Sequence, residues 1–217
     1  MAVTMADISH LRKMSGAGMM DCKKALEEAG NDFDKAMEII RKKGQAVAAK
    51  RSDREASEGC VLAAENAGFA AIVALKCETD FVAKNEQFVA LTQDILNVAM
   101  SVKPETVEAL LASPLADGRA IQEHITDRVG VTGEKMELGF YQFVNGASSV
   151  SYIHPGNKLA TIVAFNEAVD HTVARDVAMQ VAAMNPVAVR AEEVPQNVID
   201  TEMEIARDKA RQSGKPE

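Results

Sequence analysis

Residues 77–88 read Cys-Glu-Thr-Asp-Phe-Val-Ala-Lys-Asn-Glu-Gln-Phe, and this stretch says more about the chain than any other. An apolar run of strand length, Ala70–Leu75, ends just before it, and an amphipathic helix is predicted from about Asn85. Between the two, the 79–82 segment (Thr79–Val82) places a carboxylate beside a large aromatic ring, where a turn residue is usual. If both point outward, the ring would enter a partner and the charge would disturb what lies beyond it.

The residues of this segment also fit ordinary structural roles. Phe81 precedes Phe88 by seven positions, so an early helix start would place it on the buried stripe of that helix. Asn85 argues the other way, because Asn favours caps over helix interiors. Asp80 alone fits a turn cap. Spacing alone therefore does not decide whether Phe81 lies in the core or on the surface.

Several other positions carry similar alternatives. Met19 and Met20 are adjacent, so either one enters a helical core while the other faces outward, or both fill gaps. Lys23 fits a solvated lysine, His154 fits a hydrogen-bonded loop histidine, and Ile125 fits a core position. None of them yields a function by itself.

Composition predicts a globular protein of 217 residues with 47% apolar and 26% charged residues. The net charge of −8 argues against a partner that is nucleic acid, because phosphates need a basic surface. Residues 1–54 are nevertheless basic, with 11 basic and 8 acidic side chains. This asymmetry fits a partner of mixed charge, or simply a solvated lysine-rich surface.

Residue types that mark cofactor chemistry are scattered. The three cysteines form no CxxC pair, which fits a reducing compartment, and the four histidines form no zinc motif. Neither a signal peptide nor an apolar run of membrane-spanning length is visible, so we expect a cytoplasmic protein without membrane contact. Without a phosphate-binding loop or a nucleophile motif, we expect no cofactor, no metal and no enzyme.

Residues 1–44 are predicted to form three short helices. Thr4 and Asp7 resemble a capping pair, Asn31 or Asp32 would cap the third helix, and Gly44 would end it. Residues 45–58, rich in Ala, Lys, Arg and Ser, are predicted to be a linker, partly helical at most.

Beyond the linker the pattern predicts an α+β fold, because strands and helices segregate along the chain. Two strands separated by residues 65–68 are predicted to form a hairpin, followed by the long helix and two helical stretches after Pro104 and Pro114. Residues 138–144, 150–154 and 159–165 are predicted to form an antiparallel meander. A final helix from Pro195 carries a narrow apolar seam for another helix: Ile199, Met203, Ala206 and Ala210.

Two long stretches resemble the translation elongation factor Ts family. They are LRKMSGAGMMDCKKAL at 11–26 and ALKCETDFVAK at 74–84. SYIHPGNKLATIVAF at 151–165, MQVAAMNP at 179–186 and RQSGKPE at 211–217 are similar to later family segments, in family order. The resemblance implies a ubiquitin-associated-like domain at 1–44, a linker at 45–58 and two core subdomains at 59–136 and 137–217.

The resemblance also implies a function and a partner. Family members bind the GDP form of the GTPase elongation factor Tu, promote GDP release and are displaced by GTP. By matching motif, the segment that helps dislodge magnesium comprises Thr79, Asp80, Phe81 and Val82. Matching contact positions are Arg12, Met19, Met20, Lys23, Ile125 and His154, and Ile125 lies in a loosely aligned segment. The alternative is a non-catalytic interaction module, which would not need the 79–82 segment.

Four features depart from the family pattern. Ser15 stands where Thr is usual, Lys76 stands where Asn is frequent, and residues 143–150 resemble a lengthened hairpin turn. Family chains continue past Gly-Lys-Pro into a returning helix and a final strand, whereas this sequence stops at Glu217. We therefore expect the last helix to be the first arm of a truncated hairpin; a complete hairpin would permit a homodimer.

Overall fold

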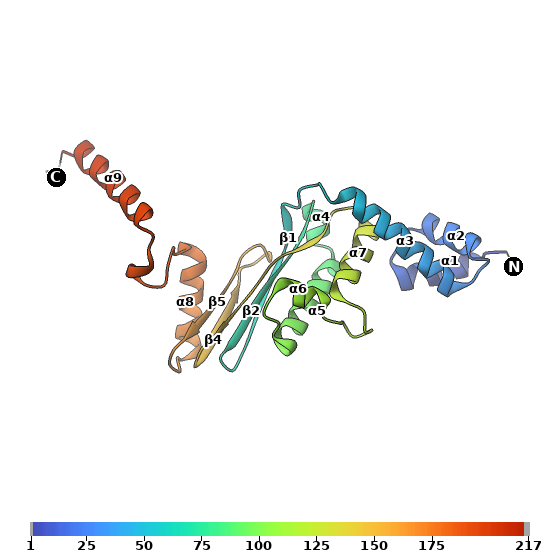
Figure 1. Cartoon of the computed structure of the whole chain (residues 1–217), viewed down its shortest axis with the longest axis horizontal. Coiled ribbons are helices and arrows are strands. Elements are labelled where there is room, and N and C mark those ends of the chain that lie inside the picture. The colour runs from blue at the N-terminus through green and yellow to red at the C-terminus, as the bar shows by residue number, and fades with distance from the viewer. Residues whose placement is uncertain (1, 215–217) are drawn as a thin grey trace. The chain divides into compact units, whose positions relative to one another are not determined.

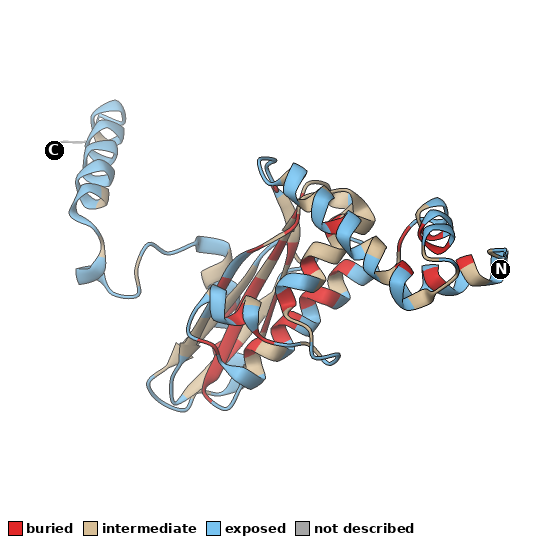
Figure 2. Ribbon diagram, turned by 45° about the vertical axis from the view of Figure 1, so that its right-hand side comes forward, coloured by how far each residue is buried: buried red, intermediate tan, exposed pale blue. Residues whose placement is uncertain are grey.

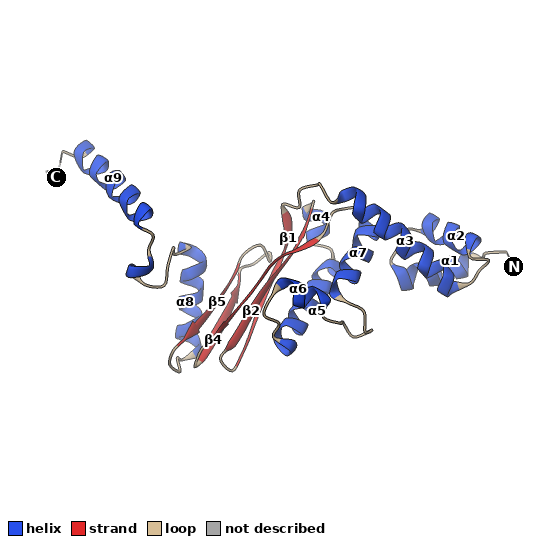
Figure 3. Cartoon of the chain, viewed as in Figure 1, coloured by secondary structure: helices blue, strands red, loops and turns tan. Residues whose placement is uncertain are grey.

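The computed structural model of the chain describes residues 2–214, and its helices and strands are shown in Figures 1 and 3. In chain order the elements are α1 (Met5–Ser15), α2 (Met19–Glu28), α3 (Phe33–Arg51), β1 (Glu58–Asn66), β2 (Phe69–Cys77), α4 (Asp80–Ala83), α5 (Glu86–Val102), α6 (Val107–Ala112), α7 (Ile121–Thr132), β3 (Glu137–Asn145), β4 (Ser148–Ile153), β5 (Ala160–Phe165), α8 (His171–Met184), η1 (Ala191–Glu193) and α9 (Gln196–Gln212). Helices combined with antiparallel sheets confirm the predicted α+β class.

The first three helices form a bundle with an apolar core of its own. The Thr4 hydroxyl accepts a bond from the Asp7 N–H at 3.2 Å, and the Asp7 carboxylate accepts one from the Thr4 N–H at 2.9 Å. Asp32 caps α3 through the Lys35 N–H. Both predicted caps are confirmed. The buried residues of this core are Ile8, Leu11, Ala17, Cys22, Ala25, Leu26 and Ala36.

The third helix is longer than predicted. Gly44 does not end it, because α3 continues to Arg51, and the predicted cap is wrong. Gly44 is buried instead where α3 crosses α7: a Cβ added to Gly130 would lie 2.4 Å from the Gly44 Cα. The glycine allows a close approach of two helices. Beyond it, Val47 and Ala48 pack against the main core.

The centre of the main sheet is a hairpin of β1 and β2. The strands pair antiparallel from Glu58↔Cys77 to Asn66↔Phe69, so Ala67 and Gly68 form the loop. Both loop residues have positive φ, 38° and 89°, as a type I′ two-residue turn requires. β3 then pairs antiparallel with β2, which gives the strand order β1-β2-β3.

The meander predicted over 138–165 is wrong at its first join. β4 pairs with β5 as expected, but these two strands form a separate sheet. The physical reason lies in the two residues between β3 and β4. The Gly146 N–H donates to the Gly68 carbonyl at 2.8 Å, and the Ala147 N–H donates to the Phe165 carbonyl at 2.8 Å. The join therefore bonds to the turn of the β1–β2 hairpin and to the end of β5, and it carries the chain from one sheet to the other, so it is not a lengthened hairpin turn.

Different layers cover the two faces of the main sheet. Val73 and Leu75 of β2 join the main core beneath α5, and Figure 2 shows how buried residues gather along the strands and the helices beside them. Ala70 and Ile72 alternate with them and are buried on the opposite face, where the β4–β5 hairpin lies. On this hairpin packs α8, whose Ala178 carbonyl accepts a bond from the Thr161 hydroxyl at 2.9 Å. The helical layer is the one that positions the 79–82 segment.

Residues 183–217 make up a second compact unit. Within it α9 has no buried residue, and Ile199 and Met203 of the predicted seam are exposed. The family-like stretch 211–217 is described only as far as Gly214, and its remaining residues lie outside the described part of the chain.

Candidate functional site

The 79–82 segment forms a short helix of its own between β2 and α5. Thr79 has extended backbone and caps α4 through the Val82 N–H, and α4 ends at Ala83. Asn85 is again extended and caps α5 through the Gln87 N–H at 3.0 Å. The predicted helix start at Asn85 is confirmed, and α4 is a separate turn ahead of it.

Phe81 points away from the protein. Its side chain is 84% exposed, whereas Ala83 is buried in the main core and Val82 packs against that core. The alternative that Phe81 continues the buried stripe of α5 is therefore wrong. Covering a ring exposed to this extent would remove apolar surface from water, which is favourable.

Asp80 stands beside the ring as a charged group. Its carboxylate accepts a bond from the Lys84 Nζ at 2.7 Å. The pKa of Asp80 is lowered, first by this hydrogen bond and then by the charge of Lys84. The segment therefore presents an apolar ring next to an anion.

Thr79 fixes the base of the segment to the rest of the core. Its N–H and hydroxyl donate to the two carboxylate oxygens of Glu134, at 3.0 Å and 2.6 Å. Glu134 belongs to the loop between α7 and β3, 55 positions along the chain. Cys77, directly before the segment, is fully buried, and burial first, then the charge of Glu134, raises its pKa to about 12. The thiol therefore stays protonated and is part of the packing.

His154 lies on an exposed turn between β4 and β5. Its Nδ1 is 2.9 Å from the Tyr152 hydroxyl, and its backbone N–H donates to the Leu159 carbonyl at 2.8 Å. Lys158 of the same turn pairs with Glu58 at 2.7 Å. The pKa of Lys158 is raised, first by that bond and to a smaller extent by Asp80. The charges of this turn and of α4 therefore act on each other.

The N-terminal candidates lie on the surface of the helical bundle. Met19 and Met20 open α2 and are 43% and 64% exposed, so the expectation that one of them enters the core is wrong. Cys22 occupies the core position of this turn. Lys23 is exposed and pairs with Glu27 at 3.7 Å, and Arg12 is exposed on α1. These two basic and two thioether side chains are accessible to a partner.

Ile125 differs from the other candidates. It is 1% exposed and lies between Ile121 and Val129 on the buried side of α7. A partner cannot touch this side chain while α7 stays packed, so the structure favours its core alternative. The loose alignment of its segment left that point open.

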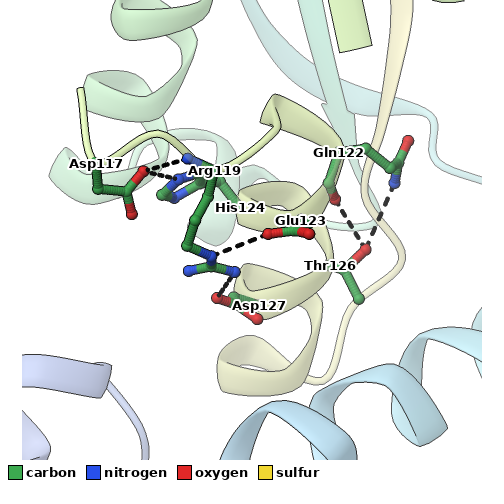
Figure 4. A network of polar contacts seen from close by, with 7 residues as sticks. All are labelled: Asp117, Arg119, Gln122, Glu123, His124, Thr126 and Asp127. Atoms are coloured by element: carbon green, nitrogen blue, oxygen red, sulfur yellow. Dashed lines mark hydrogen bonds and ion pairs between the residues drawn. The ribbon is translucent and has the colours of Figure 1, made fainter. Parts of the chain in front are cut away.

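Sequence reasoning missed a groove that Arg12 lines. The groove, of about 880 Å³, lies between the helical bundle and the helices α5 and α7. Four of its lining residues, from α7 and the loop before it, belong to a polar network (Figure 4): Asp117, Arg119, His124 and Asp127. Arg119 donates to Asp127 at 2.7 Å and to Glu123, outside the groove, at 3.0 Å, and Asp117 lies 3.0 Å from the His124 ring. The spacing of four between Arg119 and Glu123 was the signal available in the sequence.

No group of three or more His, Cys, Asp or Glu side chains within residues 2–214 could hold a metal ion. No helix in this range is long and apolar enough to cross a membrane.

Comparison with known proteins gives one consistent family. The model of the family described as "Elongation factor TS" matches residues 78–217. A protein named elongation factor Ts from Porphyromonas gingivalis is 74% identical over the whole chain, which covers 79% of that relative. Proteins of the same name from Azobacteroides pseudotrichonymphae and Bacteroides fragilis are 56% and 60% identical, over 100% and 97% of this chain and 79% and 64% of their own lengths. The chain therefore belongs to the elongation factor Ts family, which acts in translation elongation.

Proposed function

We propose that the chain binds elongation factor Tu in its GDP form and accelerates GDP release. The observation that carries this proposal is the exposure of Phe81 on a turn whose base is bonded to the core. Membership of the elongation factor Ts family supports the choice of partner. No covalent step in this chain is required, and the site of action would be the cytoplasm.

Phe81 would supply the free energy that opens the nucleotide site. Burying a phenylalanine side chain is worth about 1.5–3 kcal/mol. If the ring is covered only when the GTPase loops have shifted, that free energy favours the state that holds nucleotide weakly. Each 1.4 kcal/mol is a factor of ten, so Phe81 alone would account for about ten- to a hundredfold in release.

Asp80 would act on the charges that hold the nucleotide. In such GTPases magnesium bridges the phosphates to the protein, so a displaced ion weakens nucleotide binding. Asp80 is ionised at neutral pH, as an exposed aspartate ordinarily is, and the Lys84 hydrogen bond lowers its pKa further. Thr79 and Val82 would hold the turn that brings Asp80 and Phe81 to this place.

The other exposed candidates would orient the chain on its partner. We propose that residues 1–44 are a ubiquitin-associated-like docking domain that uses Arg12, Met19, Met20 and Lys23. Residues 45–58 would link it to core subdomains at 59–136 and 137–217, with His154 as a second contact. Ile125 would act indirectly, because its side chain is buried in the main core.

GTP would expel the chain by linkage. A factor that weakens nucleotide binding to its partner must itself be bound more weakly when nucleotide is present. Binding of GTP would therefore release the chain without any chemical change in it.

The direct test is release of a fluorescent GDP from elongation factor Tu in a stopped-flow chase with excess nucleotide. The chain should raise the release rate, with saturation at high concentration and many turnovers per molecule. Binding without acceleration would favour a passive interaction module, and no effect at micromolar chain would contradict the proposal.

A further inference from the structure

Two carboxylates connect the base of α4 to the loop after α7, and each accepts hydrogen bonds from the other segment. Glu134 in that loop accepts the N–H and the hydroxyl of Thr79 at 3.0 Å and 2.6 Å. In the opposite direction Glu78, next to Thr79, accepts the Lys135 N–H at 2.7 Å. Adjacent residues of each segment thus give and receive bonds. This arrangement, which we call the carboxylate clamp (Glu78, Thr79, Glu134, Lys135), fixes the two segments against each other.

The two carboxylates of the clamp are held differently. Glu78 also pairs with Arg54 at 2.9 Å and Arg51 at 3.6 Å, at and just beyond the end of α3. Glu134 forms no ion pair within residues 2–214. Its two carboxylate oxygens instead accept the N–H and the hydroxyl of Thr79. Hydrogen bonds to an ionised acceptor are about twice as strong as neutral ones. The bonds to Thr79 are therefore the main polar contacts of the Glu134 carboxylate.

The Thr79 hydroxyl connects this bond to the helix that carries Phe81. The hydroxyl has one proton, which it donates to Glu134, and its oxygen accepts the Val82 N–H at 3.5 Å. Glu134 thereby selects the orientation in which Thr79 caps α4. Because the Phe81 side chain is almost fully exposed, the backbone of α4 is what sets its direction.

We propose that Glu134 is a positioning residue for nucleotide exchange: it holds Thr79 as the cap of α4 and so fixes where Phe81 points. This inference rests on the proposed function for its activity readout, and on the free chain alone for its structural readout. Glu134 would not need to touch the partner or its nucleotide.

The structural readout uses the absence of tryptophan from the sequence. Phe81→Trp introduces a single indole at the tip of α4, and its fluorescence anisotropy reports how firmly the turn is held in the free chain. Adding Glu134→Gln, which puts an amide NH₂ group in place of one acceptor oxygen, should lower the anisotropy and raise quenching by acrylamide. Adding Glu137→Gln instead is the matched control, because Glu137 pairs with Lys76 and Lys135 but not with Thr79.

The activity readout uses chains with Phe81 intact. Glu134→Gln should lower the maximal rate of GDP release about tenfold, as expected for about 1.4 kcal/mol, and change the half-saturating chain concentration less than threefold. Thr79→Val removes the hydroxyl that donates to Glu134. The maximal rate of the double variant should be no lower than that of the slower single variant. Glu137→Gln should stay within twofold of the original chain.

The outcomes separate the two proposals. Unchanged indole anisotropy together with a full maximal rate in Glu134→Gln would overturn the role of Glu134. If the original chain fails to accelerate GDP release, the proposed function fails, and the anisotropy comparison still decides whether Glu134 holds the turn. If Glu134→Gln does not fold, Thr79→Val carries both measurements: an unchanged anisotropy and rate in that variant would equally overturn the role.

Discussion

Phe81 and Phe88 are both phenylalanines, seven positions apart, yet one side chain is exposed and the other is buried. Phe81 is 84% exposed and Phe88 is fully buried. In one continuous helix a spacing of seven would put both rings on one face. The difference shows that the chain changes direction between them, so that α4 and α5 are separate helices.

Two caps within a few residues produce this change of direction. Thr79 and Asn85 both have extended backbone, and each bonds to an N–H of the helix that follows it. Only a single turn, Asp80–Ala83, fits between them. Beyond Asn85 a buried stripe that includes Leu91 and Ile95 anchors α5 to the sheet. One turn thus exposes its aromatic ring, and the next helix buries its own in the core.

The largest expected effect is on Phe88. Phe88→Ala should lower the free energy of unfolding by about 3–5 kcal/mol, because a cavity would remain in the main core. Phe81→Ala should change it by less than about 0.5 kcal/mol, as surface substitutions usually do. Urea unfolding of the two variants measures both values. Similar losses in the two would mean that Phe81 is packed in solution, and the comparison would collapse.

The next effect concerns the boundary between the two helices. Asn85→Ala removes the side-chain cap of α5 and should cost about 1 kcal/mol. Asn97→Ala is the matched control, because Asn97 is exposed within α5, where Ala favours the helix. Thermal unfolding of both variants tests this. A loss at Asn97 equal to that at Asn85 would show that the cap does not define the boundary.

The smallest effect is the pH dependence of the α4 base. The pKa of Glu78 is lowered, first by the Lys135 N–H and then by Arg54, so its ionised form stabilises the fold. This contribution is fully present above about pH 4.3, the usual Glu value, and is lost as the pH falls through the lower folded pKa. The difference in Tm between the original chain and Glu78→Gln should therefore persist down to about pH 4 and shrink below it. A difference that ignores pH, or that the exposed Glu105→Gln reproduces, would contradict this assignment.

Local signals in the sequence predicted much of this fold. The caps Thr4, Asp32 and Asn85 and the hairpin of β1 and β2 depend on neighbouring residues and are confirmed. The strand that pairs with β3 was predicted wrongly, because the Gly146 N–H donates to Gly68, in a turn far away in the chain. The predicted end of α3 at Gly44 was wrong for the same kind of reason. Gly44 allows the close approach of Gly130 on α7, which lies far away in the sequence.

The candidate site was predicted in position but not in geometry. The residue types at Asp80 and Phe81 marked the segment, and spacing alone left the direction of the ring open. The contact of Thr79 with Glu134 joins residues 55 positions apart and has no local signature. Ile125 shows the converse: the family resemblance implied a contact role for it, whereas its apolar spacing with Ile121 and Val129 agrees with the core position that it occupies.

Whether the exposed ring of α4 drives exchange is tested by comparing two exposed phenylalanines in the GDP-release assay. Phe140, on β3, is 46% exposed and lies outside the 79–82 segment, so Phe140→Ala is the matched control for Phe81→Ala. We predict that Phe81→Ala lowers the maximal release rate by about tenfold or more. Its melting temperature should stay unchanged, and Phe140→Ala should keep the original rate. Full acceleration by Phe81→Ala, or an equal loss in both variants, would contradict the assignment of exchange to the exposed ring of α4.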